Sequence, residues 1–124
     1  LDMDWHTLTE ADPGRDTLAF EDKSLDEIGL IPEIISRYRS PYFQHIFAGG
    51  YSSGYYSYIW SAVLDADAFE AFKEAGDLFD KETAKAFRAN LLSKGNTDEP
   101  MVLYKKFRGK EPAIEPLLKR RGLD

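Results

Sequence analysis

The chain has 124 residues, enough for one domain, and 43% of them are apolar, which is ordinary for a globular protein. A net charge of −6, with no lysine–arginine stripe before the last twenty residues, excludes the electrostatic footprint of a nucleic-acid-binding protein. The absence of cysteine excludes a disulfide scaffold, a thiolate metal site and a cysteine nucleophile, and it favours a cytoplasmic location.

The first 39 residues predict short helices joined by turns. Residues 1–8 resemble the end of a helix, and Pro13 and Gly14 break the pattern after it. Apolar side chains at positions 18, 20, 25 and 28 then predict a helix over 17–28. Because the sequence opens at Leu1 in the middle of such a pattern, we expect the chain to be a piece of a longer polypeptide.

The next stretch is harder to assign. Residues 31–39 lie between two prolines, and the residue before a proline is pushed toward extended backbone, so helix and coil both stay open. A short helical turn is expected over 41–47, and it runs into Gly49 and Gly50. Signals for β-strands are weak here and elsewhere, so the chain predicts an all-α fold.

The segment Ser40–Leu64 contains no Asp, Glu, Lys or Arg, although 31% of the whole chain is charged. Eight aromatic residues and His45 lie in it. A solvated helix or loop would carry charge on its wet face, so we expect this segment to be buried on nearly all sides while it presents hydroxyls and an imidazole to a ligand. It is too polar for a membrane span, and no signal peptide is visible.

The longest helix is predicted from about Ser53 to Glu74, with Gly76 after it. Three tyrosines at helical spacing share one of its faces, namely Tyr51, Tyr55 and Tyr58. We expect this face to open on a concave side of the molecule. On another face, Trp60 and Val63 are expected to point into the core.

Three short helices are predicted in the rest of the chain. Asp80 caps the first, over 81–94, and Thr97 or Asp98 caps the second, which Gly109 ends after Arg108. Pro112 opens the last one. We therefore expect one helical fragment, 1–124, composed of lead-in helices and turns (1–39), a loop with a long helix (40–76) and three C-terminal helices (77–124).

The residues that could perform chemistry have structural explanations as well. A lone histidine in an apolar stretch, as His45 is, is more often a core residue than a ligand, and His6 has only polar neighbours. Gly49, Gly50 and Gly54 could simply end helices, although paired flexible joints around one tyrosine would let a loop close over a ligand. Tyrosines at helical spacing are often core, yet every buried hydroxyl needs a partner, and clustered hydroxyls are suitable donors to peptide carbonyls or an oxyanion.

Several other chemistries are excluded by the sequence. It contains no HExxH motif, no histidine pair at ligand spacing, no GxSxG motif and no phosphate-binding loop. The residues of this chain therefore predict no metal site of their own.

The run HIFAGGYSSGYYSYIW, from His45 to Trp60, closely resembles the substrate-binding segment of the thimet oligopeptidase family of zinc metallopeptidases. This family includes the oligopeptidases A and the peptidyl-dipeptidases, also called dipeptidyl carboxypeptidases. The likeness continues through VLDADAFEAF, LLSKGNTDEPM and YKKFRGKEPAIEPLLKRRGL, the last of which is the characteristic ending of these enzymes. The runs SPYFQHIF and GKEPAIEPLLKRRG look most like the peptidyl-dipeptidase branch.

The resemblance implies roles for individual residues. Tyr58 corresponds to the tyrosine that stabilises the oxyanion of the tetrahedral intermediate. His45 and Tyr51 match residues that contact the substrate backbone at the scissile bond, and Tyr55 lies near the primed side. The resemblance also implies a helical, zincin-like parent enzyme whose zinc is bound by an HExxH helix and a downstream glutamate, all of which precede the segment present here.

The expected function follows from this resemblance. The chain would be the substrate-binding and oxyanion-stabilising part of a zinc metallopeptidase that releases C-terminal dipeptides from oligopeptides, inactive and metal-free by itself. Its partners would be the oligopeptide substrate and the remainder of the parent catalytic domain, with no nucleic acid and no membrane. The alternative is a non-catalytic helical domain, either structural or with a tyrosine-rich surface that binds another protein.

Overall fold

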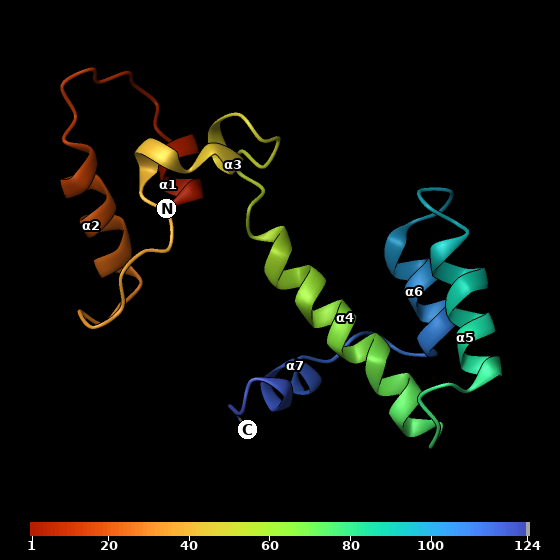
Figure 1. The fold of residues 1–124 in the computed structure, drawn as a ribbon. Helices are drawn as coiled ribbons and strands as arrows, with labels where there is room; N and C mark the ends of the chain where they lie inside the picture. Colours follow the sequence, from red (N-terminus) through yellow and green to blue (C-terminus); the bar gives the residue numbers. More distant parts are fainter. Residues whose placement is uncertain (124) are drawn as a thin grey trace. The chain divides into compact units, whose positions relative to one another are not determined.

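The computed structural model describes residues 1–123 as helices joined by turns, and no strand occurs among them (Figure 1). The predicted all-α fold class is confirmed. The chain divides into two compact units, the first over Leu1–Ser57 and the second from Tyr58 onward. None of the helices in the described range has the length and apolar character that a bilayer crossing requires.

Short helices make up the first unit. Its elements are α1 (Asp2–His6), α2 (Thr17–Glu27), a 3₁₀ turn (Ser40–Tyr42) and α3 (Gln44–Phe47). The carboxylate of Asp16 caps α2 by accepting from the backbone N–H groups of residues 18 and 19, and Gly29 follows the helix with φ +75°. The helix predicted over 17–28 is therefore confirmed to within one residue. Residues 31–39, which the sequence left open, form turns and no helix.

Trp5 of α1 joins the elements of the first unit. Its ring lies 4.0 Å from that of Phe20 on α2, measured between centroids, and its Nε1–H donates to the hydroxyl of Ser40 at 2.7 Å. Glu21 of α2 is fully buried, and its carboxylate accepts from the backbone N–H of Ser40 and lies 2.6 Å from Nε of Arg39. A buried carboxylate is tolerated only when it is paired in this way, so the Arg39–Ser40 junction is tied firmly to α2.

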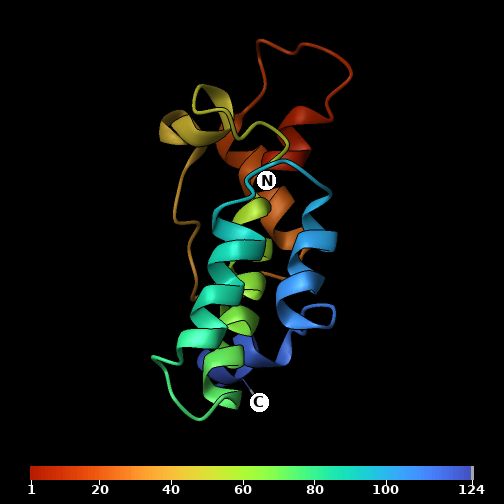
Figure 2. The same cartoon turned by 90° about the vertical axis from the view of Figure 1, so that its right-hand side faces the viewer.

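The second unit contains the longest helix and three shorter ones. Its elements are α4 (Ser57–Glu74), which it takes up from Tyr58 on, then α5 (Lys81–Phe87), a π-helical turn (Arg88–Leu92), α6 (Pro100–Arg108) and α7 (Glu115–Arg120). The helices α5 and α6 run side by side (Figure 1, Figure 2), with the ring centroids of Phe87 and Phe107 5.2 Å apart. Val63 and Ala66 of α4 pack with Leu117 of α7 into a small apolar core.

A polar network is buried beside this core. Asp67 of α4 is 1% exposed, and its carboxylate accepts from the hydroxyl of Tyr104 at 2.6 Å and from Nε of Arg108 at 3.1 Å. The guanidinium of Arg108 also binds Glu74 with both terminal nitrogens. Burial and the neighbouring Asp67 raise the pKa of the Tyr104 hydroxyl well above its usual range, so it stays protonated and remains a donor.

Helix ends differ from the sequence prediction at four places. Thr97 or Asp98 was expected to cap α6, whereas its N-cap is Glu99, without a side-chain cap bond. The helix expected from Ser53 begins at Ser57, because residues 52–56 form turns instead. The helix expected over 81–94 keeps its Asp80 cap but changes to a π turn at Arg88, where the Asn90 side chain donates to the Ala86 carbonyl and competes with the backbone ladder. The last helix begins at Glu115 instead of Pro112.

Burial of the charge-free segment was predicted wrongly. Trp60 is 56% exposed, whereas Val63, the other residue expected in the core, is buried as predicted. Packing against α7 begins at Ala62 and Val63, so a residue one turn earlier on α4 lies outside the core. Units of this size cannot enclose a long uncharged segment on all sides, and Tyr42 and Ile59 are exposed as well.

Candidate functional site

The ring of His45 lies at the centre of a group of aromatic side chains in the first unit. Its centroid is 5.8 Å from that of Tyr38, 6.0 Å from Tyr51 and 5.9 Å from Tyr55. Tyr51 and Tyr55 meet edge to face at 6.3 Å. Tyr38, Phe43, His45, Tyr51 and Tyr55 together form what we call the histidine–tyrosine cluster.

Phe43 forms the buried base of the histidine–tyrosine cluster. It stacks on Tyr38 with the centroids 4.9 Å apart, and the edge of its ring meets Tyr55 at 4.8 Å. These contacts hold the tyrosine rings in fixed positions, while His45, Tyr51 and Tyr55 stay partly exposed. If Tyr51 and Tyr55 were fully buried, they would be explained as residues of the core alone, but both are partly exposed.

The glycines after α3 have conformational roles in this structure. A Cβ added to Gly49 would lie 2.8 Å from the Cα of His45, so only glycine lets the chain pass this close to the histidine. Gly50 has φ +80°, in the left-handed region. The chain then turns back, and the N–H of Tyr51 donates to the carbonyl of His45 at 3.1 Å. Closure of this loop over a ligand stays a prediction.

Tyr51 and Tyr55 stand on a loop and not on the long helix. We call residues 51–55 the tyrosine loop. The hydroxyl of Ser52 donates to the carbonyl of Ile46 at 2.6 Å, and the N–H of Gly54 donates to the carbonyl of Tyr51 at 2.9 Å. Ser53 has φ +55°, which is rare for a residue with a side chain. The shared helical face predicted for the tyrosines is therefore wrong for Tyr51 and Tyr55.

A buried carboxylate faces the tyrosine loop from α1. Asp2 accepts from the N–H of Ser53 at 3.0 Å and from the N–H of Tyr55 at 2.9 Å, one bond to each of its oxygens. Nδ1 of His6 lies 2.9 Å from the Asp2 carboxylate and 2.8 Å from the Asp2 carbonyl. Because both of these atoms are acceptors, Nδ1 carries the proton that binds them.

Asp2 and His6 were not predicted from the sequence as residues that support the site. An aspartate in the first turn of a helix is usually explained by the helix dipole, and nothing local indicates a partner more than fifty residues away. The i to i+4 spacing of Asp2 and His6 was a usable signal, since it places both side chains on one face of a helix.

The structure thus brings together five of the six predicted site residues, all in the first unit: His45, Gly49, Gly50, Tyr51 and Tyr55. Tyr58, the predicted catalytic residue, begins the second unit in the first turn of α4, where its side chain is 47% exposed. The roles assigned to all six stay predictions.

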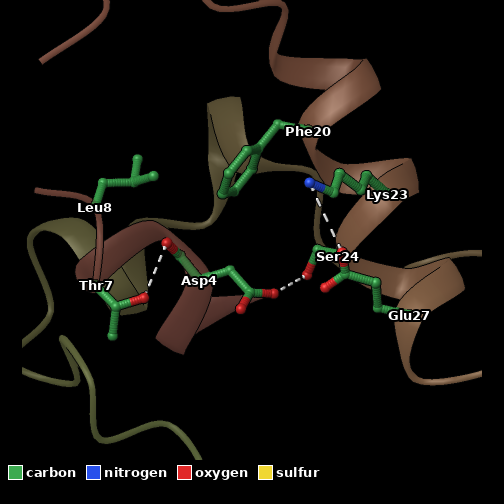
Figure 3. Close-up of a pocket in the computed structure, with 7 residues that line it drawn as sticks. All are labelled: Asp4, Thr7, Leu8, Phe20, Lys23, Ser24 and Glu27. Atoms are coloured by element: carbon green, nitrogen blue, oxygen red, sulfur yellow. Dashed lines mark hydrogen bonds and ion pairs between the residues drawn. The ribbon is translucent and has the colours of Figure 1, made fainter. Parts of the chain in front are cut away.

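Two of the cavities in the first unit border α1. One, of about 340 Å³, adjoins the histidine–tyrosine cluster and is lined by four aromatic rings, those of Tyr38, Phe43, Tyr55 and Tyr56, together with Asp2 and Arg37. The other, of about 190 Å³, lies between α1 and α2, where the carboxylate of Asp4 points toward Ser24 and accepts a hydrogen bond from its hydroxyl (Figure 3). The first is apolar and suited to a side chain, whereas the second is crossed by the contact that joins the two helices.

The side chains of the described residues do not form a metal site. No group of three or more His or acidic side chains in residues 1–123 is arranged to hold a metal ion. The carboxylate of Asp2 and the imidazole of His6 bind each other and the tyrosine loop. A zinc ion would therefore need ligands from outside the described part of this chain.

Comparison with known proteins identifies the family. The sequence profile of Peptidase family M3 matches residues 1–123. Dipeptidyl carboxypeptidase of Escherichia coli is 44% identical over the whole chain, and oligopeptidase A of the same species is 44% identical over 82% of it. A probable cytosolic oligopeptidase A of Arabidopsis thaliana is 53% identical over 65% of it.

These relatives are much longer proteins. The chain spans 18% of the length of the Escherichia coli dipeptidyl carboxypeptidase and 16% of that of the oligopeptidase A. The matched region includes the histidine–tyrosine cluster, the tyrosine loop and the four helices of the second unit. The resemblance found in the sequence is thereby confirmed, and the chain belongs to Peptidase family M3.

Proposed function

We propose that this chain is the substrate-binding and oxyanion-stabilising part of a zinc metallopeptidase that hydrolyses oligopeptides and releases C-terminal dipeptides. The observation that carries the proposal is the grouping of His45 of α3 with Tyr51 and Tyr55 of the tyrosine loop, in a chain of a peptidase family. The aromatic rings and hydroxyl groups of these residues suit a peptide ligand, whose backbone offers neutral N–H and C=O groups.

Each residue has a distinct part in this proposal. The Tyr58 hydroxyl donates to the oxyanion that forms when the scissile carbonyl is attacked. His45 and Tyr51 bind the substrate backbone, and Tyr55 contacts the primed side. Gly49 and Gly50 let the backbone pass close to His45 and place Tyr51 beside it.

Zinc belongs to the proposed parent enzyme and not to this chain. Since the described residues offer no metal-binding group, the ligands come from elsewhere in the parent, and this chain alone would bind no zinc and cleave no peptide. Its partners are then the rest of the parent catalytic domain and the oligopeptide substrate, with no nucleic acid and no membrane. A cytoplasmic location is supported by the name of the Arabidopsis relative and by the lack of cysteine.

Release of dipeptides is supported by the extent of the matches. The dipeptidyl carboxypeptidase matches all of this chain, whereas the oligopeptidases A match a smaller share of it. Digestion of a peptide with a free C-terminus by the full-length enzyme should therefore yield dipeptides in sequence, as read by mass spectrometry. Internal cuts without dipeptide products would contradict this mode of cleavage.

The central test is Tyr58→Phe in the zinc-loaded full-length enzyme. If its hydroxyl donates to the oxyanion, the hydrogen bond strengthens only in the transition state, so kcat should fall by about 10²–10³ while KM changes little. Tyr51→Phe should instead raise KM with a smaller loss in kcat. Tyr42→Phe is the matched control, because Tyr42 is exposed and lies outside the histidine–tyrosine cluster. A Tyr58→Phe enzyme with nearly full kcat would overturn the role of Tyr58.

A non-catalytic interaction surface is the second candidate. The exposed Ile59 and Trp60 at the start of α4 favour it, since exposed aromatic and apolar side chains also form protein-binding hot spots. Under this alternative, Trp60→Ala would abolish binding of a protein partner, and Tyr58→Phe would leave peptide hydrolysis by the parent unchanged.

A further inference from the structure

The helix α1 is five residues long, yet its side chains reach several separate segments of the first unit. Asp4 accepts from Ser24 on α2, and Trp5 packs on α2 and donates to Ser40. The ring of His6 lies 5.6 Å from that of Phe47 on α3. With α2 and α3 both attached to it, α1 is a fixed support for anything else that it binds.

Asp2 uses this support to bind the tyrosine loop. Its two carboxylate oxygens accept one backbone N–H each, from Ser53 and from Tyr55. A carboxylate that accepts from two amides two residues apart fixes the backbone between them, and bonds to an ionised acceptor are about twice as strong as neutral ones. Because Asp2 is buried, water does not readily replace these bonds.

The tyrosine loop needs such an anchor. Ser53 occupies the left-handed region, a conformation that persists in a residue with a side chain only when the surroundings hold it. Tyr51 and Tyr55 lie at the two ends of this loop, with Ser53 between them. Their rings contact each other and the ring of His45. The bonds from Asp2 therefore act at the backbone positions that decide where these rings lie.

His6 orients the carboxylate of Asp2. Its Nδ1–H points at both the carboxylate and the carbonyl of Asp2, so it holds the side chain against its own helix. The ring of His6 is held in turn by Phe47. A carboxylate fixed by a histidine in this way keeps both oxygens turned to the tyrosine loop.

We propose that Asp2, oriented by His6, is a positioning residue that holds the tyrosine loop in the conformation that binds substrate. The inference rests on the proposed function, because it treats Tyr51 and Tyr55 as substrate contacts. Asp2 itself touches no substrate. It acts through the backbone of Ser53 and Tyr55.

The first measurement is amide hydrogen exchange of the full-length protein, followed by mass spectrometry of a peptide that covers residues 51–56. Asp2→Asn turns one acceptor oxygen into a donor that faces a backbone N–H, so exchange there should accelerate about tenfold or more. Asp4→Asn is the matched control, since it makes the same change on the same helix at a residue that contacts Ser24 and not the loop. Unchanged exchange at 51–56 in Asp2→Asn would overturn the proposal.

The second measurement separates positioning from general stability. In the zinc-loaded enzyme, Asp2→Asn should raise KM about tenfold and lower kcat less. Tyr51→Phe should then raise KM much less in the Asp2→Asn background than in the wild type. The Tyr51 hydroxyl would already be displaced from the substrate, so its removal would cost little further binding. If Tyr51→Phe raised KM by the same factor in both backgrounds, the positioning role of Asp2 would be contradicted.

His6→Phe provides a second variant if Asp2→Asn does not fold. It keeps an aromatic ring beside Phe47 and removes both ring nitrogens, including the Nδ1–H donor to Asp2. Hydrogen exchange at residues 51–56 and KM should therefore rise as in Asp2→Asn, but by a smaller factor. Unaltered exchange and KM in this variant would remove His6 from the proposal. A wild-type enzyme without peptidase activity would refute the proposed function, while the exchange result would still decide whether Asp2 anchors the tyrosine loop.

Discussion

The two units each contain a buried aspartate, and the groups that surround the two carboxylates differ. Asp67 in the second unit accepts mainly from side chains, the guanidinium of Arg108 and the hydroxyl of Tyr104, both from α6, with one longer contact of 3.4 Å from the backbone N–H of Ala113. Asp2 in the first unit binds two backbone N–H groups of a loop, together with the imidazole of His6. The first arrangement ties helix to helix, and the second sets the conformation of a loop.

The comparison shows how the same side chain serves stability in one place and loop geometry in another. A carboxylate paired with a guanidinium in the interior has its charge compensated, and its loss leaves the cation with less compensation. Loss of a carboxylate that binds only neutral loop amides should cost less, because no buried charge is left behind and the released loop can change its conformation. Asp67 should therefore control unfolding, whereas Asp2 should control the site.

The largest expected effect comes from Asp67→Ala. The variant loses two hydrogen bonds to a buried carboxylate, from Arg108 and from Tyr104, each worth about 1.5–3 kcal/mol, while Glu74 still compensates the guanidinium charge. Urea denaturation monitored by circular dichroism would measure this loss. Asp65→Ala is the matched control on the same helix: its ion pair with Arg120 is exposed, so the loss should be about 0–1 kcal/mol. Similar losses for the two variants would break the comparison.

Gly49→Ala should have a smaller effect on stability and a clear effect on the site. The added Cβ would lie 2.8 Å from the Cα and 3.0 Å from the carbonyl oxygen of His45, so the backbone must move. Overpacking of this kind typically costs about 1–3 kcal/mol. We expect KM for peptides to rise as well, whereas Gly29→Ala, at a glycine with open space and φ +75°, should leave KM unchanged. An unaltered KM in Gly49→Ala would place His45 outside the binding site.

The smallest expected effect is the pH dependence at Glu74. Its hydrogen bonds and ion pair with Arg108 lower the pKa of this carboxyl from 4.5 to about 2. Since the folded pKa lies below the unfolded one, the stabilisation is fully present above pH 4.5 and is lost as the pH falls toward 2. The urea midpoints of wild type and Glu74→Gln should therefore differ at pH 6 and converge near pH 2. The difference should be modest, because Glu74 is half exposed. A constant difference across this range would show that the Arg108 contact to Glu74 does not affect stability.

Regular helices were predicted well from the sequence because their signals are local. The cap at Asp80 and the end of α6 at Gly109, with φ +76°, follow from chemistry within one turn of the chain. The start of α4 was placed four residues too early because the serine, glycine and two tyrosines of 53–56 fit a helix as well as a turn. What decides against the helix is the carboxylate of Asp2, which is distant in the sequence.

The sequence named residues that the structure groups, but it did not predict how they are arranged. The charge-free run pointed to His45 and the tyrosines, and the structure brings His45, Tyr51 and Tyr55 together. Their support by Asp2 and His6 could not be found, since it arises only when α1 and the tyrosine loop are folded against each other. Burial of Trp60 was predicted from the helix face that it shares with Val63, and a shared face does not say where packing along the helix begins.

The long sequence separation between Asp2 and Ser53 has a consequence for the order of folding. Closing a loop of 51 residues costs on the order of 3–4 kcal/mol in chain entropy, as much as the hydrogen bonds to the carboxylate can return. The cost falls if nearer partners meet first. The contacts of Asp4 with Ser24, at a separation of 20, and of Trp5 with Ser40, at 35, leave only the short stretch from Ser40 to Ser53 to be closed.

The tyrosine loop should accordingly be the last part of the first unit to become ordered. During synthesis from the N-terminus, α1 and α2 can assemble before the loop has left the ribosome, and the loop then finds a finished partner. In refolding experiments, protection of the Trp5 indole should appear before protection of the Tyr55 amide. The proposed substrate-binding conformation of the tyrosine loop would then form only after α1 and α2 have packed against each other.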